Sequence, residues 1–300
     1  MTGGIKMAAF KDLTTAQEIK AYLLKVLSRT GNRNKDTACL YHYTKISSLV
    51  SILSSGFFWL GSAEKMNDYL EGEFIQSVKS GNRLFFSCFS RAEENLAMYK
   101  MYAPGPSGAM MAVPFSTAQA MIDLLPKSEN GRKMVRIVRD NKLTNETVEA
   151  DVYWAAVVYK DLHTNLLVSE TVVNNQMKNA LTDPTLAGFV KLYGWEYEKE
   201  VRLCAVTARD LQENERVAIS FPEDMIKKVS VVTVPGFDKK RHRGDLSKLR
   251  RMGVSVHDSE YDGLVDLGFQ DADRLEVLEK ENEALKKEID RLKATTSGKI

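Results

Sequence analysis

Glutamates recur at every second position in residues 195–202, and this spacing suits them to chemistry. On a strand, Glu196, Glu198 and Glu200 would project from one face and the intervening aromatic residues from the other, because successive side chains alternate. Carboxylates clustered on a fixed strand stabilise a developing positive charge, as in the cleavage of a glycosidic bond. The alternative explanation is a strand face exposed to solvent.

Two further patterns, YHYT at Tyr41–Thr44 and FFSCFS at Phe85–Ser90, combine histidine, hydroxyl and aromatic side chains. Each also has a structural explanation. His42 fits a core histidine whose ring is hydrogen-bonded, Thr44 fits the cap of the following helix, and Ser90 fits the cap of its own helix. The patterns by themselves leave a catalytic and a structural role open.

A basic stretch, KKRHR at Lys239–Arg243, follows a predicted strand and turn, and Lys248, Arg250 and Arg251 come soon after it. If this stretch lines a cleft, it binds the phosphate groups of a ligand or of a nucleic acid; the alternative is a solvated loop. No aromatic residue is interleaved with the cations to stack on bases. The candidates for phosphate contact are Lys239, Lys240, Arg241 and Arg243.

The elements that position these patterns are helices early in the chain and mainly strands later. The YHYT pattern lies where a strand meets a helix, whose apolar residues recur at helical spacing from Ile46 to Leu53 and which ends at Gly56. Ser90 and Glu93 form a capping box for a further helix, and another helix is expected from residue 116. Strands are predicted at residues 57–60, 84–89, 134–139, 148–159, 217–221, 229–234 and 254–256. Because β-α-β alternation is irregular, the pattern indicates the α+β class.

The three patterns and their surroundings resemble the DUF2971 family of uncharacterised proteins. The segments concerned are LYHYTKISSLVSILSSGFFWLGSAEKMNDYLEGE, RLFFSCFSRAEENLAMYKMYAPGPSG and WEYEKEVRL, which follow one another over roughly residues 38 to 260. The first segment also resembles ADP-ribosyltransferase-like domains such as DarT. Tyr69 stands where the DUF2971 family often has proline, and Tyr99 where it commonly has tryptophan, so the details of a pocket are expected to differ.

The resemblance implies an α+β fold, the split, mixed β-sandwich of ADP-ribosyltransferases with flanking helices, and NAD+ as a substrate bound in its cleft. It implies that His42 contacts a ribose of NAD+ and that Ser87 supplies the hydroxyl of the middle strand. The residues assigned to NAD+ are His42, Tyr43, Thr44, Ser87, Phe89, Asn67 and Asp68.

The resemblance also assigns the catalytic residues. Glu200 would stabilise the oxocarbenium-like transition state, and Glu198 would orient the acceptor. The expected function is an NAD+-dependent ADP-ribosyltransferase that modifies a macromolecule, as a toxin or a phage-defence effector. The alternatives are a non-enzymatic dimer that binds nucleic acid or protein through the basic stretch, and a hydrolase of NAD+ or nucleic acid.

Apolar residues near the C-terminus are spaced alternately by three and four, the pattern of a coiled coil. They are Leu275, Leu278, Leu285, Ile289 and Leu292, and the polar Asn282 occupies the remaining seam position between Leu278 and Leu285. Asn282 at a seam position favours a parallel pair, and the flanking charges are arranged to attract across it. The pattern predicts a parallel homodimer through residues 275–292; the alternative is one amphipathic helix folded back on the body. The expected domains are residues 1–37, a helix and loop; 38–268, the ADP-ribosyltransferase-like domain; and 269–300, the coiled coil.

The overall composition excludes several classes of protein. Hydrophobic residues make up 44% and charged residues 27%, which is typical of a globular protein, and 42 Lys and Arg against 40 Asp and Glu give no global affinity for nucleic acid or membranes. The three cysteines lack paired spacing, so neither a disulfide framework nor a metal site is expected. No apolar run is long enough for a membrane span, and a cytoplasmic location is expected.

Overall fold

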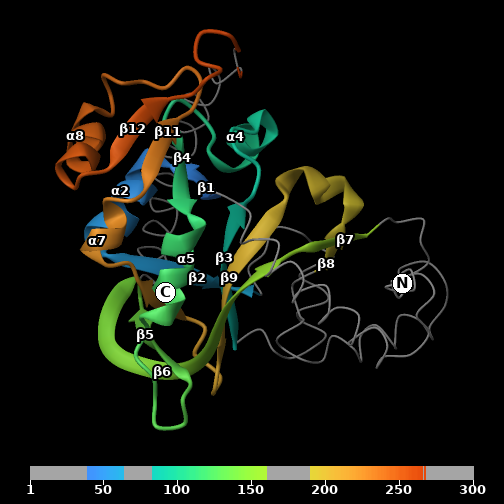
Figure 1. The fold of residues 1–300 in the computed structure, drawn as a ribbon, viewed down its shortest axis with the longest axis vertical. Helices are drawn as coiled ribbons and strands as arrows, with labels where there is room; N and C mark the ends of the chain where they lie inside the picture. Colours follow the sequence, from blue (N-terminus) through green and yellow to red (C-terminus); the bar gives the residue numbers. More distant parts are fainter. Residues whose placement is uncertain (1–38, 64–82, 161–189, 266, 268–300) are drawn as a thin grey trace, which may run out of the picture.

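The centre of the fold is a closed, antiparallel barrel of six strands (Figure 1). The computed structural model describes residues 39–63, 83–160, 190–265 and 267. Each barrel strand pairs with two neighbours, in the order β3-β2-β10-β5-β6-β9 and back to β3. The strands are β2 (Phe57–Ser62), β3 (Leu84–Ser90), β5 (Lys133–Arg139), β6 (Lys142–Ala156), β9 (Glu200–Thr207) and β10 (Glu215–Ser220).

Four more strands extend the sheet outward from β3. They are β1 (Cys39–Lys45), β4 (Gly108–Pro114), β11 (Ser230–Thr233) and β12 (Ser255–Asp258). β1 meets β3 at the pair Tyr41 and Ser90 and then diverges from it, whereas β1 and β4 pair along their whole length. A separate parallel pair is formed by β7 (Val158–Lys160) and β8 (Val190–Leu192).

Short helices cover the outer strands and one end of the barrel (Figure 1). They are α2 (Ile46–Ser55), α4 (Leu96–Tyr102), α5 (Phe115–Asp123), α7 (Glu223–Ile226), α8 (Arg243–Arg251) and the 3-10 helix η4 (Tyr193–Glu198). As predicted, α2 buries Ile46, Leu49 and Leu53 and ends at Gly56, whose φ of +68° suits glycine. The Trp154 indole donates a hydrogen bond of 3.0 Å to the Ala118 carbonyl, which ties α5 to β6.

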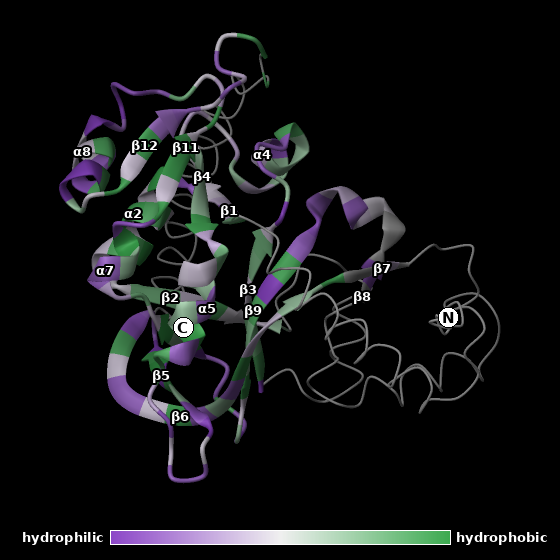
Figure 2. Cartoon of the chain, viewed as in Figure 1, coloured by the Kyte–Doolittle hydropathy of each residue, from purple (hydrophilic) through white to green (hydrophobic). Residues whose placement is uncertain are grey.

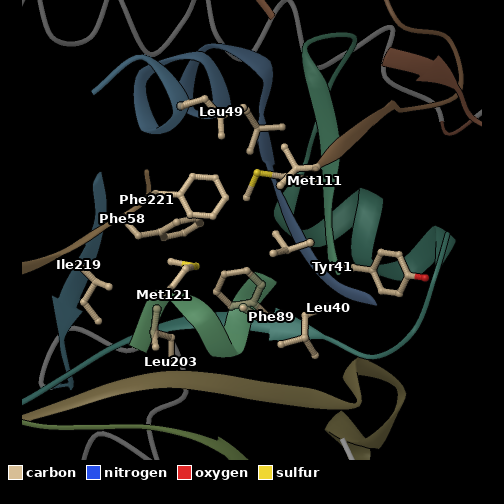
Figure 3. Packing of buried hydrophobic residues seen from close by; sticks show 14 of the residues in the cluster. Leu40, Tyr41, Leu49, Phe58, Phe89, Met111, Met121, Leu203, Ile219 and Phe221 are labelled. Carbon is tan, nitrogen blue, oxygen red and sulfur yellow. The ribbon is translucent and has the colours of Figure 1, made fainter. Parts of the chain in front are cut away.

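The main core is formed by residues in the barrel interior together with the buried faces of α2 and α5. Figure 3 shows Phe89, Met121, Leu203 and Ile219 converging from four elements. Hydrophobic residues concentrate on the barrel strands and hydrophilic ones on α8 (Figure 2). Burial of this apolar surface supplies the main driving force for the fold.

Strand β3 is buried on both faces, and its two faces contribute to different clusters. Phe85 and Phe89 face the main core, while Leu84 and Phe86 face a second cluster with Cys204. Because side chains alternate along a strand, Ser87 shares the first face and Cys88 the second. Residues on the two faces of β3 cannot meet at one ligand without a rearrangement.

The predicted fold class is wrong. The resemblance implied a split, mixed β-sandwich, but the strands around β3 close into an antiparallel barrel because β9 pairs with both β6 and β3. This closure depends on pairing between strands more than a hundred residues apart, which local patterns do not record. The predicted C-terminal coiled coil, residues 269–300, lies outside the described residues.

Some local predictions also need correction. Glu196, Glu198 and Glu200 do not share a strand face, because η4 continues to Glu198 and β9 begins at Glu200. Ser90 does not cap a helix; α4 begins later and is capped by Asn95, whose side chain accepts hydrogen bonds from two backbone N–H groups. In the described residues, no helix is long and apolar enough to cross a membrane.

Candidate functional site

The strand register brings the three sequence patterns to one corner of the barrel. Tyr41 of β1 lies opposite Ser90 of β3, and Ser90 lies opposite Glu200 of β9. The Ser90 hydroxyl donates a hydrogen bond of 2.6 Å to the backbone carbonyl of Glu198, which fixes the turn before β9. The corner therefore holds the carboxylates of the third pattern against the ends of the other two.

Two carboxylates and two cations form a buried cluster at this corner. The Lys191 ammonium lies 2.7 Å from Glu198 Oε2 and 2.8 Å from Glu200 Oε2. On the other side of Glu200, Arg202 donates through Nε at 2.7 Å and through Nη2 at 3.1 Å. None of the four residues is more than 7% exposed, so each charge depends on its partners to offset the cost of leaving water.

Two tyrosines complete the cluster. The Tyr102 hydroxyl donates a hydrogen bond to Glu198 Oε1, and the Tyr159 hydroxyl accepts a hydrogen bond of 2.7 Å from the backbone N–H of Glu200. The two hydroxyls give hydrogen-bond partners to Glu198 Oε1 and to the Glu200 N–H, because buried polar groups need such partners.

The electrostatics of the cluster keep Glu200 ionised. Burial alone would raise the pKa of Glu200, but the Arg202 guanidinium and the Lys191 ammonium outweigh it and lower that pKa to about 2. For Lys191, burial would lower the pKa, and the Glu200 and Glu198 carboxylates raise it instead. Burial and the nearby Glu200 charge raise the pKa of Cys88, so this thiol stays protonated. The cluster therefore holds the positive charges of Lys191 and Arg202 beside carboxylates.

His42 lies on the other side of β3 from Glu200. Its Nδ1 is 2.8 Å from the Cys88 carbonyl, and its ring packs against Phe58 and Phe89 at centroid distances of 5.3 and 5.1 Å. Burial lowers the pKa of His42, although the hydrogen bond to Cys88 opposes this shift. His42, Ser87 and Phe89 thus belong to the main core, and the structure does not bring them together with the carboxylate pair.

Of the remaining residues assigned to NAD+, Tyr43 and Thr44 lie on β1 and have structural contacts of their own. The Tyr43 hydroxyl donates to the Ala92 carbonyl at 2.9 Å and accepts from the Asn95 N–H at 3.1 Å, so it anchors the loop before α4. Thr44 lies opposite Ala109 on the β1–β4 ladder and is not a helix cap. Asn67 and Asp68 lie outside the described residues.

The predicted phosphate-binding residues lie far from the carboxylates in the sheet, since their loop follows β11 and two strands separate β11 from β3. Lys239 is paired with Asp258 at 2.7 Å. Asp238 accepts two hydrogen bonds of 3.0 Å, from the backbone N–H groups of Lys240 and Arg241. Lys240, Arg241 and Arg243 are exposed.

Sequence reasoning missed four members of the cluster, namely Lys191, Arg202, Tyr102 and Tyr159. Arg202 stands two residues after Glu200, a spacing that places both on one strand face, and this signal was available. Neither a family model nor a curated protein matches the chain in the comparisons. The assignment to the DUF2971 family therefore stays a prediction.

Proposed function

We propose that the chain is an NAD+-dependent ADP-ribosyltransferase in which Glu198 and Glu200 act at the bond between nicotinamide and ribose. One observation carries this proposal: the Lys191 ammonium lies between the two carboxylates, 2.7 Å from Glu198 and 2.8 Å from Glu200. Cleavage of that bond creates a positive charge on the ribose, and a preformed carboxylate pair stabilises it more in the transition state than in the ground state.

In the proposed reaction, the bond between ribose C1′ and the nicotinamide nitrogen breaks, and its electron pair leaves with nicotinamide. The positive charge is then shared between C1′ and the ring oxygen, beside Glu200. A nitrogen or oxygen of the acceptor forms the new bond to C1′ and gives up its proton to Glu198, the residue expected to orient the acceptor. The acceptor is a macromolecule.

The proposal has a structural requirement, because Glu198 and Glu200 are buried. The substrate reaches them after Lys191 leaves, and Lys191 lies on β8, which pairs with β7 and not with the barrel. The proposal leaves His42 out of the reaction, because its ring faces the main core on the other side of β3.

Nicotinamide release and transfer of labelled ADP-ribose from NAD+ test the proposal. We expect the wild type to release nicotinamide and Glu200→Gln to be slower by at least about 100-fold, the usual loss when a charge-stabilising group is removed. Absence of release by the wild type, or equal rates for the two proteins, would overturn the proposal. Release without transfer would identify a hydrolase and overturn the assignment to transfer.

Glu215→Gln is the matched control. Glu215 is also buried and paired with an arginine, with 2.7 Å between its Oε1 and Arg139 Nη2, but it lies on β10, away from the corner. We expect both variants to be less stable than the wild type and only Glu200→Gln to lose nicotinamide release. Rates are compared at a temperature where all three proteins have the same far-UV circular dichroism.

We also propose that two chains pair through residues 275–292. This proposal rests on the spacing of the apolar residues and on Asn282, because the segment lies outside the described residues. Mass measurement in solution tests it: a dimer that Asn282→Ile converts to another oligomer is the expected result, and a monomeric wild type contradicts it.

A further inference from the structure

A groove opens on the surface where α2, α7 and α8 meet the end of the barrel. Its volume is about 680 Å³, and it is lined by the C-terminal turn of α2, the start of β2, the end of β10 and residues 250–253. The Phe221 N–H donates a hydrogen bond of 2.7 Å to the Gly56 carbonyl, and the Ser54 hydroxyl contacts the Met252 sulfur at 3.8 Å. These contacts hold segments distant in sequence around one concavity.

The groove carries a net positive charge. Its lining contains three cations, Lys227, Arg250 and Arg251, and one carboxylate, Glu223. Residues 223–253 contain nine Lys and Arg against four Asp and Glu, a net charge of +5, whereas the whole chain carries +2. Of these nine cations, three line the groove and four lie in the loop Lys239–Arg243, outside it.

Few carboxylates neutralise these cations. Among the described residues, none lies within ion-pair distance of Arg250 or Arg251. Lys227 lies 3.4 Å from Glu223, but both side chains are mostly exposed, at 60% and 83%, so water screens this pair. The groove therefore presents charge that a polyanion can use.

An aromatic side chain lines the same groove as these cations, although it is far from them in the sequence. Phe57, at the start of β2, lines the groove together with these cations and is half-buried. The Arg136 guanidinium, which does not line the groove, lies over the Phe57 ring at 5.7 Å from its centroid. Sites for single-stranded nucleic acid combine two features. Cations contact the phosphate backbone, and a neighbouring aromatic ring stacks on the bases.

A membrane surface fits the groove less well. Binding to a bilayer uses protruding apolar side chains, whereas the apolar residues Leu53 and Phe221 in this groove are buried. The exposed large apolar residues of the described chain, Met101, Leu124 and Leu264, do not line it.

We propose that this groove binds single-stranded nucleic acid, with Lys227, Arg250 and Arg251 contacting phosphates and Phe57 stacking on a base. The site differs from the loop at Lys239–Arg243, and it does not depend on the proposed NAD+ chemistry.

Fluorescence anisotropy with labelled 12-nucleotide single-stranded DNA and RNA tests the proposal. We expect Arg250→Gln/Arg251→Gln to weaken binding by at least 10-fold and to lower the slope of log affinity against log salt by about 1.4, which corresponds to two lost phosphate contacts. Phe57→Leu is expected to weaken binding by about 5- to 150-fold with an unchanged slope, because stacking is lost and charge is not.

Lys127→Gln/Lys142→Gln is the control, since it removes two exposed cations outside the groove. We expect it to bind like the wild type, and an equal loss would show that net charge, not the groove, determines binding. Binding to phosphatidylserine vesicles without binding to either oligonucleotide would also overturn the proposal. Glu200→Gln should keep full oligonucleotide binding, which separates a failure of this proposal from a failure of the NAD+ proposal.

Discussion

Replacing Glu200 by glutamine leaves Lys191 and Arg202 beside a neutral amide inside the protein. Removing one partner of a buried ion pair costs about 3–5 kcal/mol. A second route gives a similar figure: the pKa of Glu200 falls from 4.5 to about 2 on folding, which corresponds to roughly 3 kcal/mol of stabilisation. We therefore expect Glu200→Gln to lower the free energy of unfolding by about 3 kcal/mol or more at pH 7.

The pH dependence gives this prediction a sign. Because the pKa of Glu200 is lower in the folded than in the unfolded state, its stabilisation is complete above about pH 4.5 and is lost as the pH falls towards 2. Between pH 7 and pH 3.5 the wild type should lose about 1.4 kcal/mol that the variant cannot lose. The difference in stability between the two proteins should narrow by that amount.

Urea unfolding followed by tryptophan fluorescence at pH 7, 5 and 3.5 measures both effects. Asp151→Asn is the control, since Asp151 is 55% exposed and pairs with Arg132 at the surface; its loss should stay below about 1 kcal/mol. A loss below 1 kcal/mol for Glu200→Gln at pH 7, or a difference that does not change with pH, would refute the assignment of Glu200 to a buried, ionised pair.

Three further predictions concern the cluster and the core. Lys191→Met should lower the free energy of unfolding by about 3–5 kcal/mol. Adding Glu198→Gln should recover part of this loss in a double-mutant cycle, because it removes the carboxylate charge that Lys191→Met leaves unpaired. Purely additive losses would contradict the pairing. Since burial holds the pKa of His42 below 6.5, the wild type should lose stability as the pH falls below 6.5, and His42→Phe should show a smaller change in urea midpoint between pH 7.5 and 5.5. Gly108→Ala would place a Cβ 1.9 Å from the Ala103 carbonyl oxygen and should lower the free energy of unfolding by about 3 kcal/mol or more. Gly61→Ala is the control: its Cβ would lie 4.0 Å from the nearest atom, so it should lower the thermal midpoint much less. Equal thermal midpoints for the two variants would contradict the packing at Gly108.

Local patterns predicted many of the elements. The apolar spacing from Ile46 to Leu53 and the glycine at position 56 gave helix α2 with its observed end, because both signals act within a few residues. The strands that carry YHYT and FFSCFS were also predicted where they occur. The capping box at Ser90 was wrong, since the Ser90 hydroxyl bonds to the distant Glu198 carbonyl instead of a helix end.

The candidate site was predicted in part. Glu198 and Glu200 do lie together, although a 3-10 helix and a turn bring them there in place of a shared strand face. The positive φ of 43° at Lys199 belongs to this turn, and alternation in the sequence does not reveal it. The association of His42 with Glu200 was inferred from resemblance, and the two side chains lie on opposite faces of β3.

By itself, the sequence determined which side chains have the chemistry to act: two close carboxylates, a run of cations, and strands and helices that local spacing specifies. Only the tertiary structure decided their partners. The closure of the barrel by β9 buries Glu200 against Lys191 and Arg202, and the approach of α8 to α2 places Arg250 and Arg251 in one groove with Phe57. The physical reason is that ion pairing and burial depend on distance in space, which long-range strand pairing sets and local sequence patterns do not contain.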